Sequence, residues 1–204
     1  MAFAARFGVS RSPVHEALIR LAGEGEHGQA PFGLTHRHQL HRLAEPFAKD
    51  PLTGDAVALI DVSAPPAFES AGGGLVSTAA DYARFLQLML GRGTATGLPG
   101  TAGPVRLASR ATIDFMTADH LGSIPTAGDI LPAGYGFGLG VAVRKATGLA
   151  SSPGSAGTYS WSGLGGTFFL VDPAEDLFAI LLTQAPGQLR TLCELYPALV
   201  YAAL

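Results

Sequence analysis

The chain has 204 residues, of which 48% are hydrophobic, 14% charged and 8% aromatic, and its formal net charge is −3. This composition is typical of a globular protein of one or two domains, and it excludes intrinsic disorder over most of the length. The slight acidity excludes a protein that is basic throughout and wraps nucleic acid.

The first 25 residues predict two short helices that are separated by a turn at Gly8. Ser10 stands where it can cap the second helix. The apolar residues of that helix recur at three- and four-residue spacing and form one stripe: Val14, Ala17, Leu18 and Leu21. The pattern ends in residues 23–33, which are rich in glycine, proline and alanine, so we expect a junction there.

Two helices are predicted in the middle of the chain, after an extended or irregular segment over residues 34–71. The first begins at Ser77 or Thr78, carries Asp81 in its first turn and ends at Gly91 and Gly93. Its buried face is Tyr82, Phe85, Leu86, Met89 and Leu90. The second helix is shorter, starts near Ser109 and buries Ile113 and Met116.

The last third of the chain changes to a period of two, which predicts strands. Alternating apolar residues over 137–143 indicate one half-buried strand. Residues 157–163, 167–172 and 177–183 give three more, and the sequence DPAED joins the last two as a turn, so we expect an antiparallel meander. Apolar residues then recur at helical spacing and predict a final helix on the sheet, bent at Pro197: Leu189, Leu192, Cys193, Tyr196, Leu199 and Val200.

The cellular compartment is predicted from the lack of a signal peptide, the lack of a membrane helix and the single cysteine. Arg6 and Arg11 interrupt the start before an apolar run of signal length can form, and no apolar stretch approaches the length of a membrane helix. Cys193 is the single cysteine and cannot pair within the chain, so we interpret it as a buried helix residue in a reducing compartment. The sequence therefore predicts a soluble, cytoplasmic protein without membrane contact.

Three segments in order carry a resemblance to a known family: GGGLVSTAADYARFLQLML, YGFGLGV and GTYSWSGLGGTFFLVDP. Together they resemble the C-terminal half of the serine β-lactamase-related family, which includes class C β-lactamases, penicillin-binding peptidases and esterases. The resemblance covers residues 33–204. It implies an α+β fold, an antiparallel sheet with flanking helices. This β-lactamase/transpeptidase-like fold would be incomplete, because the family's first strands and catalytic helix have no counterpart here.

The family's chemistry rests on a nucleophilic serine in an S-x-x-K motif, a Y-x-N motif and a third motif, K-T-G or W-x-G, on a strand beside the site. The resemblance implies that Trp161, Ser162 and Gly163 occupy the third position and line the acyl pocket. The backbone N–H of Leu164 would then be an oxyanion donor. A small ester or amide is the implied substrate, and no cofactor is implied.

The first two motifs are missing from the sequence. The chain has two lysines, Lys49 and Lys145, preceded three positions earlier by Pro46 and Ala142, and it has no asparagine. Ser155 and Ser162 do not stand in a G-x-S-x-G nucleophile elbow. We therefore expect a truncated family member that is inactive alone, with an ancestral hydrolysis of esters, β-lactams or short amides.

A second resemblance covers residues 1–25, where FAARFGVSRSPVHEALIRLAGEG is similar to the helix-turn-helix of GntR-type regulators. It implies that Arg11 and Arg20 contact DNA, although His15 stands where these regulators generally carry arginine. The chain would then divide into a helix-turn-helix fragment, 1–30, and a β-lactamase-related region, 31–204. The alternative function is a DNA-binding regulator whose C-terminal region binds a ligand.

Two further features are given structural interpretations. The spacing of His36, His38 and His41 fits no metal site with a fourth partner, and the glycine run 72–74 lacks the lysine of a phosphate loop, so we predict no metal. The absent strands would leave a sheet edge open, and unpaired N–H and C=O groups recruit other strands. The sequence thus predicts self-association through that edge.

Overall fold

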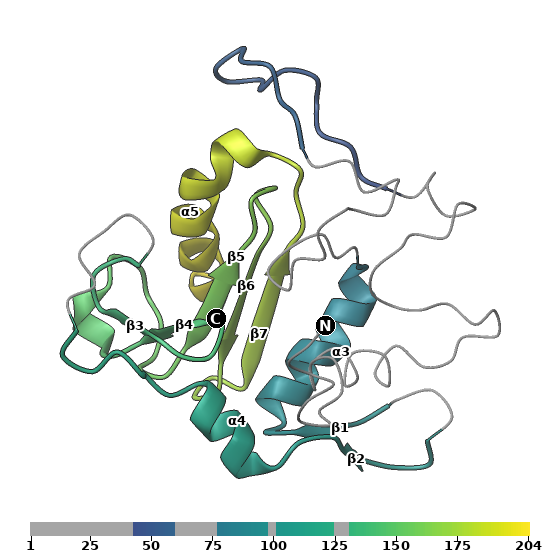
Figure 1. Ribbon diagram of the computed structural model, residues 1–204, viewed down its shortest axis with the longest axis vertical. Coiled ribbons are helices and arrows are strands. Elements are labelled where there is room, and N and C mark those ends of the chain that lie inside the picture. Colours follow the sequence, from purple (N-terminus) through teal and green to yellow (C-terminus); the bar gives the residue numbers. More distant parts are fainter. Residues whose placement is uncertain (1–42, 60–76, 98–100, 125–130) are drawn as a thin grey trace, which may run out of the picture. The chain divides into compact units, whose positions relative to one another are not determined.

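A computed structural model describes residues 43–59, 77–97, 101–124 and 131–204 of the chain (Figure 1). The chain divides into two compact units, and each is described by itself. The first comprises Met1–Leu43, Ile60–Leu88 and Thr94–Leu107, and the second comprises Ala44–Leu59, Met89–Gly93 and Ala108–Leu204. The predicted helix-turn-helix, its boundary at residue 30, the three histidines and the glycine run lie outside the described residues.

Helix α3, Ala79–Leu90, confirms the first predicted central helix. Thr78 caps it, because its Oγ1 accepts from the Asp81 N–H at 3.2 Å and donates to the Asp81 carboxylate at 2.9 Å. Asp81 also receives the Arg84 guanidinium at 2.6 Å. Leu86 and Met89 are buried as predicted, while Tyr82, Phe85 and Leu90 are half-buried.

A small two-stranded sheet completes the described part of the first unit. Strand β1, Thr94–Ala95, pairs antiparallel with β2, Val105–Arg106. Leu88 and Ala95 are buried together there, with Phe85, Val105 and Leu107 packed against them. The sequence analysis did not predict these strands, since two residues are too few for a period of two to be visible.

The second unit is built on a five-stranded antiparallel sheet in the order β3-β4-β5-β6-β7, so each strand pairs with its neighbours in sequence (Figure 1). The strands are β3 Tyr135–Phe137, β4 Ala142–Arg144, β5 Tyr159–Ser162, β6 Phe168–Asp172 and β7 Leu177–Leu181. The predicted meander and the turn after Asp172 are confirmed. Leu170 and Val171 of the central strand β6 are fully buried.

The prediction of one strand over residues 137–143 is wrong, because the segment is a hairpin. Strand β3 ends at Phe137 and β4 begins at Ala142, with a turn closed by the Gly138 N–H and the Val141 carbonyl at 2.8 Å. Gly140 has φ +93°, which glycine adopts without strain. Alternating glycines at 138 and 140 mimic the strand period, but here they supply a reversal that leaves Leu139 exposed.

Helix α5, Leu189–Tyr201, confirms the predicted C-terminal helix and covers one face of the sheet (Figure 1). The Tyr196 ring meets Phe168 edge-on at 6.1 Å, and its Oη donates to the Ile180 carbonyl at 2.8 Å. Leu199 is exposed, contrary to the predicted buried stripe, because the sheet contacts only one side of the helix. Cys193 is free and half-buried rather than buried.

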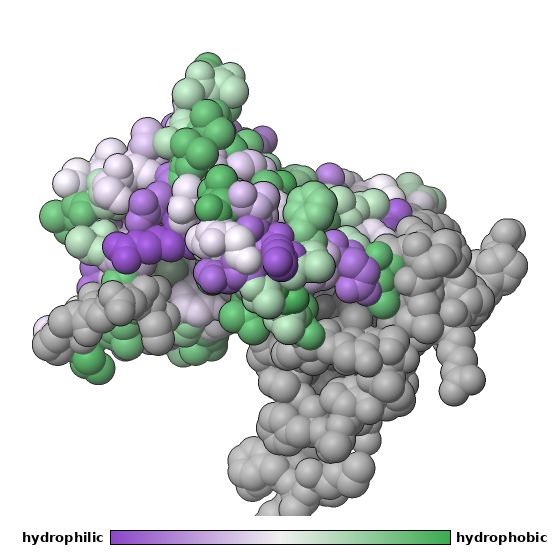
Figure 2. All heavy atoms as spheres, turned by 90° about the horizontal axis from the view of Figure 1, so that it is seen from above, coloured by the Kyte–Doolittle hydropathy of each residue, from purple (hydrophilic) through white to green (hydrophobic). Residues whose placement is uncertain are grey.

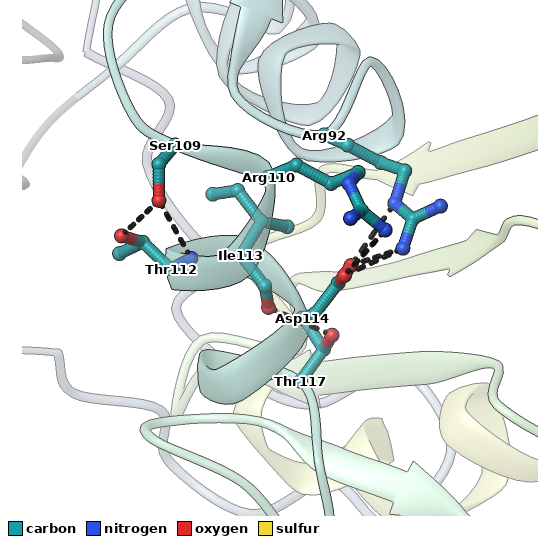
Figure 3. Close-up of polar contacts among 7 residues, drawn as sticks. All are labelled: Arg92, Ser109, Arg110, Thr112, Ile113, Asp114 and Thr117. Atoms are coloured by element: carbon teal, nitrogen blue, oxygen red, sulfur yellow. Dashed lines mark hydrogen bonds and ion pairs between the residues drawn. The ribbon is translucent and has the colours of Figure 1, made fainter.

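Helix α4, Arg110–Met116, begins where the sequence predicted a helix start near Ser109, and Ser109 caps it, since its Oγ accepts from the Thr112 N–H at 3.0 Å (Figure 3). Asp114 of this helix receives the Arg92 guanidinium through both nitrogens, Nε at 2.9 Å and Nη2 at 2.5 Å. Arg110 lies 3.6 Å from the same carboxylate. Ile113 is buried, whereas Met116 is only half-buried. This cluster attaches α4 to the turn that follows α3.

The surface of the described residues is mixed. Figure 2 shows apolar residues scattered among polar ones on the face it draws. The most exposed large apolar side chains include Phe47, Leu52, Phe115 and Leu164. Within the described ranges, no helix has the length and apolar character needed to cross a membrane.

Candidate active site

The three residues of the predicted third motif lie where β5 turns into β6. Trp161 and Ser162 are the last residues of β5, and Gly163 follows them. The Gly163 N–H donates to the Thr167 carbonyl at 2.8 Å, and the Gly166 N–H donates to the Gly163 carbonyl at 2.9 Å. These two bonds close a tight hairpin turn whose tip is Leu164 and Gly165.

The glycines of this turn are required by close neighbours. A Cβ at Gly163 would collide with Thr167 Oγ1, and a Cβ at Gly166, where φ is +90°, would lie 2.7 Å from Thr183 Oγ1. The Thr183 hydroxyl in turn donates to the Gly166 carbonyl at 2.8 Å. Contacts within the protein therefore hold the turn against the segment that follows β7.

The tip of the turn leaves two backbone donors without a partner among the described residues, the N–H groups of Leu164 and Gly165. The Leu164 N–H has no hydrogen-bond partner among the described residues, and the side chain is 68% exposed. An amide N–H at the second position of a tight turn points away from the bonds that close it. It is available to an oxygen atom that approaches from outside.

Trp161 lies beside Phe137 of β3, with the two rings edge-on at a centroid distance of 5.0 Å. Both side chains are half-buried. Ser162, the next residue, pairs with Phe168 of β6, whose ring meets Tyr196 of α5, so its side chain lies on the face that α5 covers. Burial raises the pKa of the Cys193 thiol on α5. Since neighbouring residues of a strand face opposite sides of a sheet, the Trp161 ring lies on the face away from α5.

The residues that the structure places against this turn are uncharged. Phe137, Thr167 and Thr183 make the contacts given above, and the Gln184 amide donates to the Ala44 carbonyl at 3.0 Å beside Gly165. A ligand here would meet an aromatic edge, hydroxyls and a free N–H. It would meet no ammonium or guanidinium group from these residues.

The opposite end of the same strands holds a buried polar cluster that the sequence analysis did not predict. Asp172, fully buried at the end of β6, accepts from Tyr201 Oη at 2.6 Å, Thr158 Oγ1 at 2.9 Å and the Ser155 N–H at 3.1 Å. Burial pushes the pKa of this carboxyl upward, but the hydrogen bonds, with that of Tyr201 foremost, hold it below its ordinary value. The same burial, aided by Asp172, raises the pKa of Tyr201 to about 12.

Arg144 of β4 belongs to this cluster and is 2% exposed. Its guanidinium donates to the carbonyls of Ser152 at 2.6 Å, Pro153 at 2.7 Å and Thr147 at 2.8 Å. Buried charges require such partners, so these bonds hold the loop between β4 and β5. The sequence feature that could have predicted this cluster is the pair of charged residues Arg144 and Asp172, which lie inside or beside predicted strands.

Among the described residues, the side chains of Lys145 and Ser155 offer no nucleophile with a base. The Lys145 ammonium lies 3.1 Å from Asp119 and donates to the Gly122 carbonyl, and Ser155 belongs to the Asp172 cluster. Arg11 and Arg20, predicted to contact DNA, lie outside the described residues. Within the part of the chain that the structure describes, no three histidine, cysteine or acidic side chains are grouped as metal ligands.

Comparisons with known proteins identify the family. The beta-lactamase family model matches residues 21–203. Protein Rv1367c of Mycobacterium tuberculosis is 38% identical over 154 residues, which cover 71% of this chain and 35% of that protein. The chain thus spans about a third of the length of the curated relatives it matches.

Two solved structures have similar folds. The hydrolase EstCE1, described as having promiscuous acyltransferase activity, is 26% identical with a TM-score of 0.50, covering 76% of this chain and 38% of that one. Simvastatin synthase (LovD) from Aspergillus terreus has a TM-score of 0.53 at 18% identity, covering 76% of this chain and 41% of that one. The second likeness concerns the fold alone, and both agree with the α+β architecture.

Proposed function

This chain belongs to the beta-lactamase family, and we propose that its β5–β6 turn forms one wall of an acyl-transfer site. In this proposal the Trp161 side chain and the backbone of Ser162 and Gly163 line the acyl pocket, and the Leu164 N–H binds the carbonyl oxygen as it gains negative charge. The observation that carries the proposal is the unpartnered Leu164 N–H on a turn whose backbone is fixed by Thr167 and Thr183. A fixed donor needs no rearrangement when charge develops.

The proposed ligand is a small neutral ester or amide. The uncharged residues around the turn support this choice, because a carboxylate that loses its water here would gain no cationic partner from them. The relative EstCE1 is described as a hydrolase with acyltransferase activity, which is the same reaction class. Carboxylate-bearing β-lactams are expected to bind less well than neutral esters.

We propose further that this chain does not perform covalent catalysis by itself. Acyl transfer in the family requires the S-x-x-K serine and lysine, and the 204 residues contain neither that motif nor an asparagine for Y-x-N. Ser162 lies on the face that α5 covers, and no hydrogen bond joins its side chain to a base among the described residues. The chain would thus correspond to part of a catalytic domain, and the nucleophile would have to come from another segment or another polypeptide.

Binding is tested through Trp161, the single tryptophan of the chain. Titration with phenyl butyrate should change its fluorescence saturably, whereas benzylpenicillin should bind more weakly. Leu164→Pro removes the N–H at a turn position that proline favours, and it should weaken phenyl butyrate binding about fivefold, the equivalent of about 1 kcal/mol for one hydrogen bond. Leu164→Ala keeps the N–H and is the control. Equal affinities for the two variants would contradict the assigned donor.

Catalysis is tested separately with p-nitrophenyl butyrate and nitrocefin. Purified protein should hydrolyse both at the rate of buffer alone, and intact-mass measurement after fluorophosphonate treatment should show no adduct. Turnover, or an adduct on any hydroxyl, would overturn the proposed inactivity but not the proposed binding site. A salt-dependent gel shift with DNA would instead support the alternative regulator.

A further inference from the structure

Strand β7, Leu177–Leu181, is the last strand of the five-stranded sheet. Within the described residues it pairs with β6 on one side, and no strand pairs with its other side. All five of its residues, LFAIL, are partly exposed. The strand contains no charged residue and no proline, and the register with β6 runs without a bulge. The strand therefore lacks charges, proline and bulges, which are the features by which edge strands usually avoid pairing with other chains.

The hydrogen-bond pattern of the sheet identifies which groups of β7 face outward. The bond from the Gly163 N–H to the Thr167 carbonyl makes these two a hydrogen-bonded pair, so every second residue of β6 from Thr167 onward bonds to β5. Phe168, Leu170 and Asp172 therefore bond to β7, through Leu181, Ala179 and Leu177. The N–H and C=O groups of Phe178 and Ile180 are left for the free edge.

A contact of α5 agrees with this assignment. Tyr196 Oη donates to the Ile180 carbonyl at 2.8 Å, and a carbonyl bonded within the β6–β7 ladder would not normally be reached from outside. The carbonyl oxygen has a second lone pair and accepts a further hydrogen bond. Tyr196 thus uses one lone pair of the Ile180 carbonyl oxygen, and the N–H groups of Phe178 and Ile180 are unaffected.

We propose that this edge binds the β7 strand of a second copy of the chain, antiparallel and two-fold symmetric about Ala179. In that register each Phe178 lies opposite Ile180 of the other copy, and both residues present their free N–H and C=O groups. The four N–H and C=O groups on each strand are then matched in full, and no charged side chains oppose each other within the strand. A five-residue strand with free groups at its second and fourth positions is complementary to itself, and β7 carries no charge, proline or bulge that would oppose pairing with a second copy.

The pairing also places equivalent faces of the two sheets on the same side. Opposed residues have numbers of the same parity, so Leu177 meets Leu181 on the side of α5, and Phe178 meets Ile180 on the other side. The two sheets would join into one continuous sheet with an α5 helix from each copy on the same face. Apolar side chains that are half-exposed in one copy would cover each other in the pair.

The oligomeric state tests this proposal directly. Light scattering after size exclusion should give twice the chain mass of 20.9 kDa at high concentration and the single mass on dilution. Hydrogen–deuterium exchange of the wild-type protein needs no variant: the amides of Phe178 and Ile180 should become protected as concentration rises, while that of Leu164 should not. A monomer at every concentration, or dimerisation without protection of these two amides, would overturn the proposal.

Two sets of variants locate the contact. Ile180→Pro removes an outward N–H and leaves the ladder to β6 intact, so it should be monomeric, whereas Ile180→Val should dimerise like the wild type. Ala179→Lys and Ala179→Asp place like charges opposite each other and should each be monomeric. Mixing the two should restore a dimer, because the charges then pair. A mixture that stays monomeric, with both variants folded by circular dichroism, would contradict the two-fold register.

Discussion

The two ends of strands β5 and β6 differ in whether their polar groups are buried or exposed to solvent. At the Asp172 end, the buried carboxylate accepts a hydrogen bond from Tyr201, and the buried Arg144 guanidinium donates to the carbonyls of the β4–β5 loop. Asp172 itself is 0% exposed. At the Trp161 end, the turn is exposed and the Leu164 N–H is free, although its backbone is fixed by glycine contacts. One pair of strands therefore joins an end where most buried polar atoms are hydrogen-bonded, with Arg144 Nε and Tyr159 Oη as exceptions, to an end whose turn is open to solvent.

This difference separates the residues that stabilise the fold from those that can bind a ligand. A buried polar group without partners costs free energy, so the hydrogen bonds to the Asp172 carboxylate contribute to the stability of the folded protein. An exposed N–H is hydrated at little cost and can exchange its water for a ligand oxygen. Substitutions at the first end should thus change stability, and substitutions at the second should change binding.

The largest effect is expected at Asp172. Asp172→Asn replaces an acceptor-only group with one that also donates, so the donors of Tyr201, Ser155 and Ala174 lose part of their bonding. We expect a loss of about 3 kcal/mol in the free energy of unfolding, measured with urea. Asp176→Asn in the same turn is the control, because Asp176 is exposed and its φ of +50° suits asparagine. Equal losses in both variants would refute the comparison.

The turn at the Trp161 end gives the next effect. Gly166→Ala and Gly157→Ala both place a Cβ at positive φ, +90° and +88°, but only the first meets atoms within 4 Å. Gly157→Ala should cost about 1 kcal/mol for strain alone, and Gly166→Ala about 2 kcal/mol or more. The same denaturation measurement applies. Equal costs would indicate that Thr183 does not hold the turn rigidly.

Acid pH should reduce the difference between wild type and Asp172→Asn. The pKa of Asp172 is lowered in the folded protein, so its contribution is complete above the unfolded value of about 4 and is lost as pH falls through the folded value. Urea unfolding from neutral to acid pH should show the two curves converging below about pH 4. A gap that stays constant would mean that the carboxylate charge does not contribute.

The smallest effect on stability is expected at Leu164. Its side chain is 68% exposed, whereas Leu170 on the neighbouring strand is 2% exposed. Leu164→Ala should change the free energy of unfolding by less than about 0.5 kcal/mol, and the matched change Leu170→Ala should cost about 3 kcal/mol. A marked loss of stability at Leu164 would show that the turn is part of the core, which would close the proposed binding surface.

The sequence analysis predicted the elements that have strong local signals. The helix starts at Ser77 or Thr78 and near Ser109, the strands around Trp161 and Phe169, and the final helix all have a pattern that is readable over a few positions. It failed over residues 137–143, where glycine served a reversal rather than a strand position. It also failed at Leu199, because periodicity shows that a helix has an apolar face but not how much of that face a neighbour covers.

Sequence alone determined the order of the elements, the resemblance to the beta-lactamase family and the absence of S-x-x-K and Y-x-N, since these depend on residues close together in the chain. Only the tertiary structure brought Asp172 to Tyr201, 29 positions away, and left Phe178 and Ile180 at an edge. Such contacts depend on strand register and helix packing, which fix partners over distances that no local pattern records.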